Sequence, residues 1–183
     1  MTANPQTQAI EIRVEGVAQL FNTLDPFPFA ERDLDGDAEE YIVGWARELA
    51  HRGPFTIVVH LPAPEADKEA ARGVPRALSR FFEYRADVVG RELNELFRIG
   101  RIALMVGLAV FGLCLAASHA VDTMAGQTYL GSFISESLII VGWVANWRPI
   151  EIFLYDWVPI LRRRNLYRRL AAANVIVKAN GER

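Results

Sequence analysis

A long stretch of this chain carries almost no charge, and this feature limits the possible folds most strongly. Between Arg101 and Arg148 there is no Lys or Arg, and the carboxylates are confined to Asp122 and Glu136. Residues 102–119 begin with the run IALMVGLAVFGLCLAA. Such a run approaches the roughly 20 apolar residues needed to cross a hydrocarbon core of about 30 Å. We therefore predict a first transmembrane span here.

A second span is predicted at 129–147, and the two spans make a hairpin over 102–147. The sequence LGSFISESLIIVGWVANW is less apolar, but Trp143 and Trp147 fall where an aromatic belt is expected, next to a basic boundary. The alternative is a pair of soluble core helices. A chain of 183 residues has little material to cover such a pair.

Basic residues predict the orientation of the hairpin. Arginines precede the first span and follow the second, whereas the connection at 119–128 has no Lys or Arg. By the positive-inside rule, both termini are cytoplasmic and the short loop faces outward, so we predict a multi-pass membrane protein. Residues 1–8 are polar and no apolar segment of a signal peptide follows them, so we expect the first span to act as an uncleaved membrane signal.

Residues 1–61 have the patterns of a small cytoplasmic α+β module. Apolar and charged residues alternate from Ile10, which is typical of a half-buried strand, and FTIVVHL at 55–61 predicts a central strand. Between these strands we predict a short helix at 17–24 and a longer one that begins with a capping box at Asp37. The predicted fold class is an α+β membrane protein, with a transmembrane hairpin, a small α/β sheet module and juxtamembrane amphipathic helices.

Residues 62–76 contain three prolines and are predicted to be a linker, followed by an amphipathic helix at 77–101 that leads into the membrane. The apolar residues of this helix recur at a spacing of about 3.5. The sheet, the C-terminal tail or the same helix of another subunit can cover them. We call this set the assembly stripe: it consists of Phe82, Val89, Leu93 and Leu96.

Residues 148–183 are predicted to hold an interfacial helix, a basic segment and a strand. Apolar residues from Ile150 to Trp157 share one helical face, as in helices that lie along a membrane surface. The strand at 175–177 is expected to pair with the N-terminal sheet. The basic cluster is typical of segments that contact anionic lipid; it consists of Arg162, Arg163, Arg164, Arg168 and Arg169.

Alternating carboxylates at Asp33, Asp35 and Asp37 offer oxygen ligands for a divalent cation. The segment departs from the EF-hand pattern, because its glycine is in the fourth position and Gly44 stands at the twelfth. The alternative is a turn into a helix, whose N-terminus favours acidic residues. No metal site is assigned.

Glu136 lies within the second predicted span, and a carboxyl group at such a depth suggests a function. His119 and Asp122 are expected near it, so the three residues could form a site for a proton, an ion or a quinone head group. The alternative is a hydrated glutamate at the membrane interface that bonds to the neighbouring helix.

The sequence offers no constellation of an enzyme and no cofactor motif. It has no GxSxG, Walker A, GxGxxG, HExxH or CxxC pattern, and Cys114 lies in an apolar run. His51 and His60 have no partner at a metal-ligand spacing and are expected to be structural. The formal net charge of −2 gives no reason to expect a nucleic-acid partner.

The segments FNTLDPFPFAERDLDGDAEEYIVGWARE and GWVANWRPIEIFLYDWVPILRRRNLYRRL, with a hairpin between them, carry a resemblance. Over about residues 10–177 the chain resembles uncharacterised bacterial inner-membrane proteins with the same layout. The resemblance implies a bacterial inner membrane and lends no catalytic or binding residue.

These patterns predict a non-enzymatic interaction protein, anchored in the bilayer, that self-assembles as a homo-oligomer or serves as accessory subunit of a larger membrane complex. An oligomeric ion or proton pathway through Glu136 is the alternative. A divalent-cation sensor at Asp33–Asp37 is a weaker one.

Overall fold

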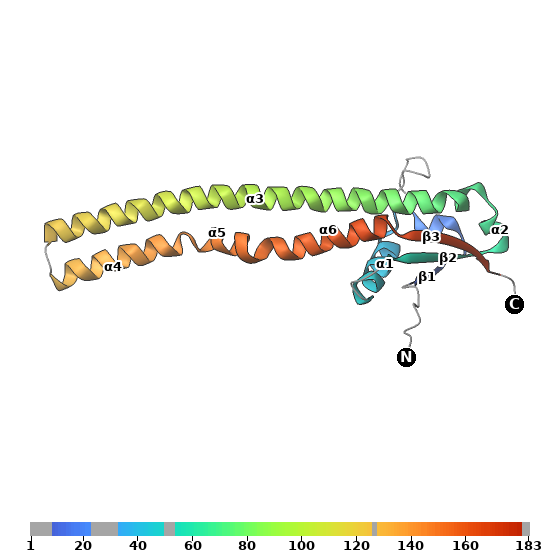
Figure 1. The fold of residues 1–183 in the computed structure, drawn as a ribbon, viewed down its shortest axis with the longest axis horizontal. Coiled ribbons are helices and arrows are strands. Elements are labelled where there is room, and N and C mark those ends of the chain that lie inside the picture. Colours follow the sequence, from blue (N-terminus) through green and yellow to red (C-terminus); the bar gives the residue numbers. More distant parts are fainter. Residues whose placement is uncertain (1–8, 23–32, 50–53, 126–127, 181–183) are drawn as a thin grey trace. The chain divides into compact units, whose positions relative to one another are not determined.

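The computed structural model describes residues 9–22, 33–49, 54–125 and 128–180 (Figure 1). The chain forms two compact units, the first from Met1–Val88 with Arg163–Arg183 and the second from Val89–Arg162. The fold is mixed α and β, with one small sheet and two long apolar helices.

The first unit is built on a parallel sheet of three strands, in the order β1-β2-β3. The strands are β1 (Ala9–Arg13), β2 (Thr56–Pro62) and β3 (Asn174–Asn180). Both strands predicted at the N-terminus are therefore confirmed. The pairing predicted for the C-terminal strand is also confirmed, because β3 pairs with β2 from Thr56 opposite Asn174 onward.

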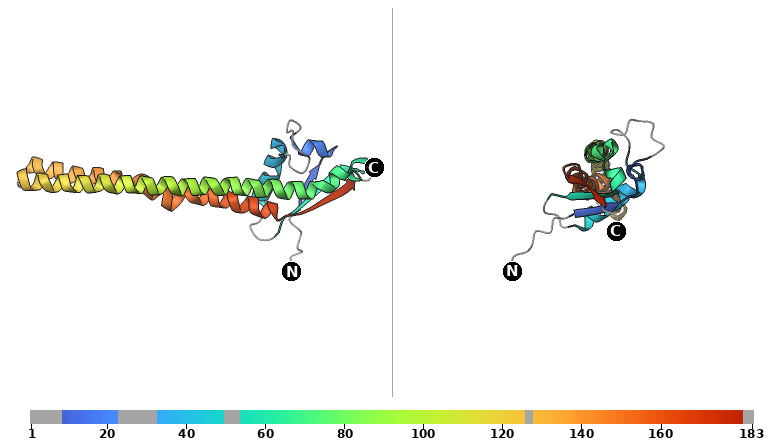
Figure 2. Two further views of the ribbon diagram at one scale, coloured as in Figure 1. Left: turned by 90° about the horizontal axis from the view of Figure 1, so that it is seen from above. Right: turned by 90° about the vertical axis from the view of Figure 1, so that its right-hand side faces the viewer.

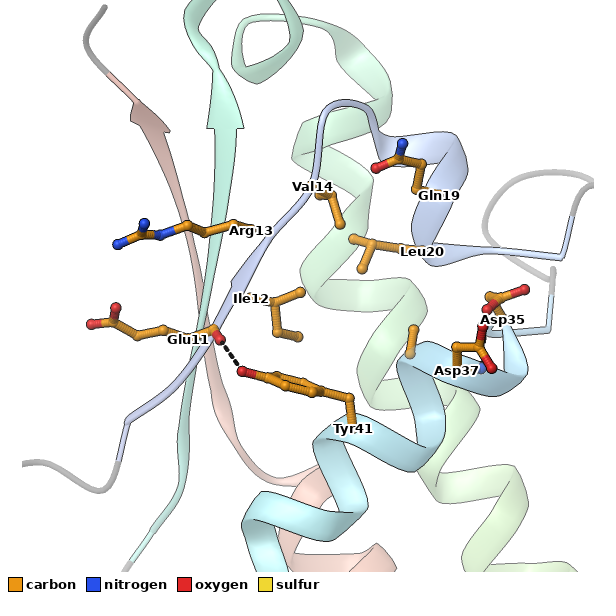
Figure 3. Close-up of a pocket in the computed structure, with 10 residues that line it drawn as sticks. Glu11, Ile12, Arg13, Val14, Gln19, Leu20, Asp35, Asp37 and Tyr41 are labelled. Atoms are coloured by element: carbon orange, nitrogen blue, oxygen red, sulfur yellow. Dashed lines mark hydrogen bonds between the residues drawn. The ribbon is translucent and has the colours of Figure 1, made fainter. Parts of the chain in front are cut away.

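One face of the sheet is apolar and buried, as the alternation in the sequence predicts. Ile10 and Ile12 of β1 lie in register with Ile57 and Val59 of β2, and all four are buried. Glu11 and Arg13 lie on the opposite face of the sheet, and both are exposed. In Figure 3, Ile12 points toward the helices, while Glu11 and Arg13 point away from them.

The described residues of the N-terminal part also form two short helical elements and one longer helix. They are the 3-10 helix η1 (Val17–Leu20), α1 (Gly36–Glu48) and α2 (Ala63–Ala66). Residues 23–24 of the short helix predicted here lie outside the described residues. The N-cap of α1 is Asp35, whose side chain accepts a hydrogen bond from Asp37 N. The helix thus begins earlier than the predicted capping box.

The predicted linker at 62–76 is corrected by the structure. This range contains α2 and the first turns of α3 (Glu69–Ala125), and Pro75 lies inside α3. Proline removes a helical hydrogen bond, but apolar residues of these turns are buried at helical spacing, which offsets that cost. They are Ala71, Val74, Ala77 and Leu78.

In the second unit, α3 runs beside a return segment (Figure 1, Figure 2). The return segment consists of α4 (Tyr129–Val144), α5 (Trp147–Glu151), the π-helix η3 (Ile152–Asp156) and the start of α6 (Trp157–Ala171). Both predicted spans are therefore helical. The long helix predicted to continue into the first span is confirmed by the single helix α3.

Small residues allow the two helices of the hairpin to approach closely. A Cβ atom on Gly107 would lie 2.7 Å from Asn146 Oδ1, and one on Gly142 would lie 2.6 Å from Phe111 Cδ2. Asn146 stands at the break between α4 and α5, where its Nδ2 donates to the carbonyl oxygens of Gly107 at 3.1 Å and Gly142 at 3.0 Å. The bond to Gly107 joins the break to α3, and the bond to Gly142 joins it to α4.

Candidate functional site

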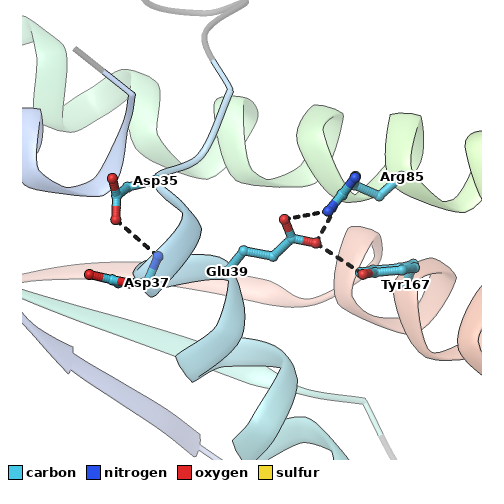
Figure 4. A network of polar contacts seen from close by, with 5 residues as sticks. All are labelled: Asp35, Asp37, Glu39, Arg85 and Tyr167. Carbon is cyan, nitrogen blue, oxygen red and sulfur yellow. Dashed lines mark hydrogen bonds and ion pairs between the residues drawn. The ribbon is translucent and has the colours of Figure 1, made fainter. Parts of the chain in front are cut away.

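Three polar side chains from three helices meet in the first unit, and we call them the Glu39 cluster (Figure 4). Arg85 of α3 donates to both carboxylate oxygens of Glu39 on α1, from Nε at 2.8 Å and from Nη2 at 2.7 Å. The hydroxyl of Tyr167 on α6 donates to Glu39 Oε1 at 2.9 Å. The Glu39 side chain is only 14% exposed, so these donors replace water around its carboxylate.

The electrostatics of the cluster favour the protonated forms of Arg85 and Tyr167. Burial raises the pKa of Tyr167 above its ordinary value of 10.0, and the hydrogen bond to Glu39 and the negative charge of Glu39 raise it further. Burial lowers the pKa of Arg85, but the hydrogen bond and the charge of Glu39 outweigh this effect, so the pKa is raised overall. The cluster is suited to holding three helices together.

A groove of about 640 Å³ lies between β1, η1 and α1 (Figure 3). Its apolar lining comes from Ile12, Val14, Leu20 and Ala38. Its polar lining comes from Glu11, Arg13, Gln19, Asp35, Asp37 and Tyr41. The groove therefore combines apolar side chains with six polar ones, of which three are acidic and one is basic.

The outer edge of β1 faces this groove. Val14 donates its backbone N–H to His60 O of β2 at 3.1 Å, so the backbone groups of the alternate residues Glu11 and Arg13 point away from β2. The Tyr41 hydroxyl donates to Glu11 O at 3.2 Å and occupies one of these groups. The groove thus gives access to the backbone of an edge strand.

The second unit exposes apolar side chains along both of its long helical segments. Of the most apolar window in each, 11% is buried for α3 and 17% for the segment that begins at Tyr129. By length and composition, both segments are able to cross a membrane. The exposed side chains include Met105, Val106, Leu113, Leu130, Phe133, Ile140 and Trp143.

The three polar residues predicted to form an intramembrane site are all exposed: Glu136, His119 and Asp122. In the described residues no hydrogen bond or ion pair joins any two of them. The contact between the helices at this level is instead made by Ser118 and Ser135, both buried, whose hydroxyl oxygens lie 2.6 Å apart. A common site of the three residues stays a prediction.

The predicted cation loop serves as a helix cap. Asp35 Oδ1 accepts the backbone N–H of Asp37 at 3.0 Å, and Asp33 is exposed. Across the described ranges, no three His, Cys, Asp or Glu side chains are grouped in a way that could hold a metal ion. The sensor hypothesis gains no support from this arrangement.

The assembly stripe is largely covered by the chain itself, and a role for it in assembly stays a prediction. Phe82, Val89 and Leu93 are buried, with exposed fractions of 0, 4 and 8%, and Leu96 is half-buried. The ring of Tyr167 stacks on Phe82 at a centroid distance of 6.2 Å. The tail, one of the covers considered above, therefore packs on the first residue of the stripe.

The basic cluster has a mixed environment. Arg162, Arg163 and Arg168 are exposed, whereas Arg164 and Arg169 are half-buried. The Arg169 guanidinium lies 4.2 Å from the centre of the Phe55 ring, a cation–π contact inside the module. Contact of the cluster with anionic lipid stays a prediction.

His60 bridges the strands of the sheet. Its Nδ1 lies 3.2 Å from Asn180 Oδ1 on β3, and its Nε2 lies 3.6 Å from a carboxylate oxygen of Glu11 on β1. This position fits the structural role predicted for it. His51 lies outside the described residues.

The structure thus defines a small parallel α/β module and an apolar helical hairpin. Comparisons of the chain with models of protein families, with curated proteins and with solved structures find no match.

Proposed function

We propose that this chain is a non-enzymatic interaction protein of a bacterial inner membrane, anchored by its hairpin with the α/β module on the cytoplasmic side. The observation that carries the proposal is the exposure of two long apolar helical segments, of which only 11 and 17% of the most apolar windows are buried. Contact with lipid removes such surface from water, at a gain of about 25 cal/mol per Å².

The connectivity of the sheet supports two membrane crossings. β2 precedes the second unit and β3 follows it, yet the two strands are neighbours in one sheet. A segment that leaves a sheet and returns to it must cross a bilayer an even number of times. Two spans in α3 and α4 meet this requirement, and the arginines at 98 and 101 and at 162–164 give the positive-inside pattern.

Alkaline extraction of membranes followed by cysteine labelling tests this topology. We expect the full chain to stay in the membrane fraction. After Cys114→Ala, a cysteine at Thr123 is expected to react with an impermeant maleimide from outside, whereas one at Ala179 reacts only after the membrane is opened. Release of the chain by alkali, or the reverse labelling pattern, would contradict the topology.

In this proposal, the α/β module binds the partner protein, and the groove beside β1 is the binding surface. An extended segment of a partner can add to an edge strand through backbone hydrogen bonds. Asp35 and Asp37 at the rim favour a segment that carries Lys or Arg. The expected partner is therefore a protein with an extended, basic segment.

Substitution of Ala38 tests the groove, because its side chain lines it. Ala38→Trp should fill the groove and remove partners that copurify with the tagged chain from mild detergent. Ala63→Trp, on the exposed surface of α2, is the matched control and should retain them. If both variants bring down the same partners in the same amounts, the groove is not the binding surface.

A second candidate function is an ion or proton pathway between several hairpins. It is favoured by the exposure of Glu136, which turns away from the buried contact of Ser118 and Ser135. A pathway requires that Glu136→Gln change flux through reconstituted vesicles. Wild-type flux equal to that of empty vesicles would remove this candidate.

A further inference from the structure

The hydrogen bond between Ser118 and Ser135 sets the positions of two polar residues, His119 and Glu136, each of which directly follows one of the serines. An α-helix turns by about 100° and rises by about 1.5 Å per residue. Because α3 and α4 run in opposite directions, these two turns bring both residues to the same side of the hairpin. Their depths differ by about 3 Å.

We call this side of the hairpin the polar face. His119 and Glu136 are both exposed on it. Glu136 lies eight residues from the N-cap Thr128, or about 12 Å along α4. In the proposed topology, both side chains then lie within the bilayer, where exposed polar groups without partners are costly. Neither has a side-chain hydrogen bond or ion pair within the described part of the chain.

We propose that a second copy of this chain covers the polar face, so that two hairpins form a four-helix bundle in the membrane. This inference rests on the proposed membrane topology. It commits to a second copy because the polar face is complementary to itself: it offers a carboxyl acceptor and an imidazole donor, at nearly the same depth and on different helices.

In the proposed dimer, the two copies are related by a two-fold axis that runs along the membrane normal. When two such faces meet across the axis, α3 of one copy lies opposite α4 of the other. His119 of each copy then faces Glu136 of its partner, and the symmetry produces the pair twice. The opposite side of the hairpin presents Ala117 and Ile134 at this depth, so it has no comparable polar pair.

The test uses the full chain, labelled with one dye per molecule, in vesicles of bacterial phospholipid. Single-molecule photobleaching gives the dimer fraction as a function of the protein-to-lipid ratio. We expect the wild type to dimerise, and Glu136→Leu and His119→Leu each to raise the apparent dissociation constant at least about tenfold, as expected for loss of polar contacts between membrane helices. Ile134→Leu on the opposite side is the matched control and should leave it unchanged.

A variant that exchanges His119 and Glu136 distinguishes the loss of a direct contact between these residues from a general loss of folding. The double variant His119→Glu with Glu136→His keeps both cross-pairs and should dimerise more strongly than either leucine variant. A monomeric wild type, or a dimer that both leucine variants leave unchanged, would overturn the inference. Extraction and labelling still report the membrane topology in either case, so failure of the dimer is distinguishable from failure of the proposed anchor.

A disulfide between chains provides a second measurement. In a Cys114→Ala background, one tagged chain carries Leu115→Cys and a differently tagged chain carries Ile139→Cys, both on the polar face. Oxidation should join the two tags, whereas Ala117→Cys with Ile134→Cys, on the other side, should not. Equal yields from the two pairs would contradict packing through the polar face.

Discussion

The hydroxyl of Tyr167 donates a hydrogen bond to Glu39 at 2.9 Å, and this contact joins residues that lie 128 positions apart in the sequence. Glu39 is on α1 and Tyr167 is on α6, while Arg85 of α3 completes the Glu39 cluster. The cluster therefore fixes α1 to helices from both of the chain segments that form the first unit. Its loss should loosen that unit before it affects the hairpin.

Tyr167→Phe removes one donor from the Glu39 carboxylate but keeps the ring that stacks on Phe82. We expect the free energy of unfolding of the first unit to fall by about 1.5–3 kcal/mol, the usual net value of a hydrogen bond to a charged group. Urea unfolding followed by near-ultraviolet circular dichroism measures this change. Tyr84→Phe, at an exposed position, is the control, and an equal effect of both substitutions would argue against the cluster.

The raised pKa of Tyr167 predicts a dependence of stability on alkaline pH. Folding favours the protonated phenol, so its contribution to stability is complete below the ordinary pKa of 10.0 and is lost as the pH rises through the higher folded-state pKa. The difference in phenolate absorbance between the wild type and Tyr167→Phe isolates this group. A difference spectrum that titrates at or below pH 10.0 would contradict the prediction.

Gly107 should be essential for close packing of the hairpin. In Gly107→Ala, the new Cβ would lie 2.7 Å from Asn146 Oδ1 and 3.0 Å from the backbone oxygen of Ala145. Overpacking of this kind costs about 1–3 kcal/mol. Gly112→Ala is a matched control, because no atom outside its own helix lies within 4 Å of the new Cβ. Unfolding in mixed detergent and SDS should separate the two variants, and equal midpoints would argue against this packing.

The Ser118–Ser135 bond predicts a non-additive pair of substitutions. Ser118→Ala leaves the buried hydroxyl of Ser135 without this partner and should cost about 1 kcal/mol. The double alanine variant removes both hydroxyls, so its cost should be smaller than the sum of the two single variants. The same detergent unfolding measures all three variants. Additive effects would mean that the two hydroxyls do not depend on each other.

Local patterns in the sequence were sufficient for most of the fold. Alternation around Ile10 and the β-branched run at 55–61 predicted β1 and β2, and the long apolar periodicity predicted α3. Pro75 led to the expectation of a linker, because proline usually ends a helix. The residues around Pro75 are helical because Val74 and Leu78, on either side of it, are buried. This burial depends on tertiary packing, which the sequence alone does not show.

The candidate sites were harder to predict, because their residues meet only in the folded chain. Glu39 and Arg85 are 46 residues apart, and no spacing rule joins them. The assembly stripe was predicted as a periodic pattern with three possible covers, and periodicity alone could not show that Tyr167 of the tail packs on Phe82. The alternating carboxylates likewise do not show by themselves that Asp35 is the residue that caps α1.

The position of β2 between its two neighbours also sets an order of events during protein synthesis. Thr56 of β2 pairs with Asn174 of β3, so the sheet stays incomplete until β3 has left the ribosome. In the proposed topology, insertion of the hairpin into the bilayer comes before that pairing. If the second span failed to cross the bilayer, β3 would stay on the outer side of the membrane. The sheet would then lack β3, and its apolar face would be exposed to chaperones and proteases.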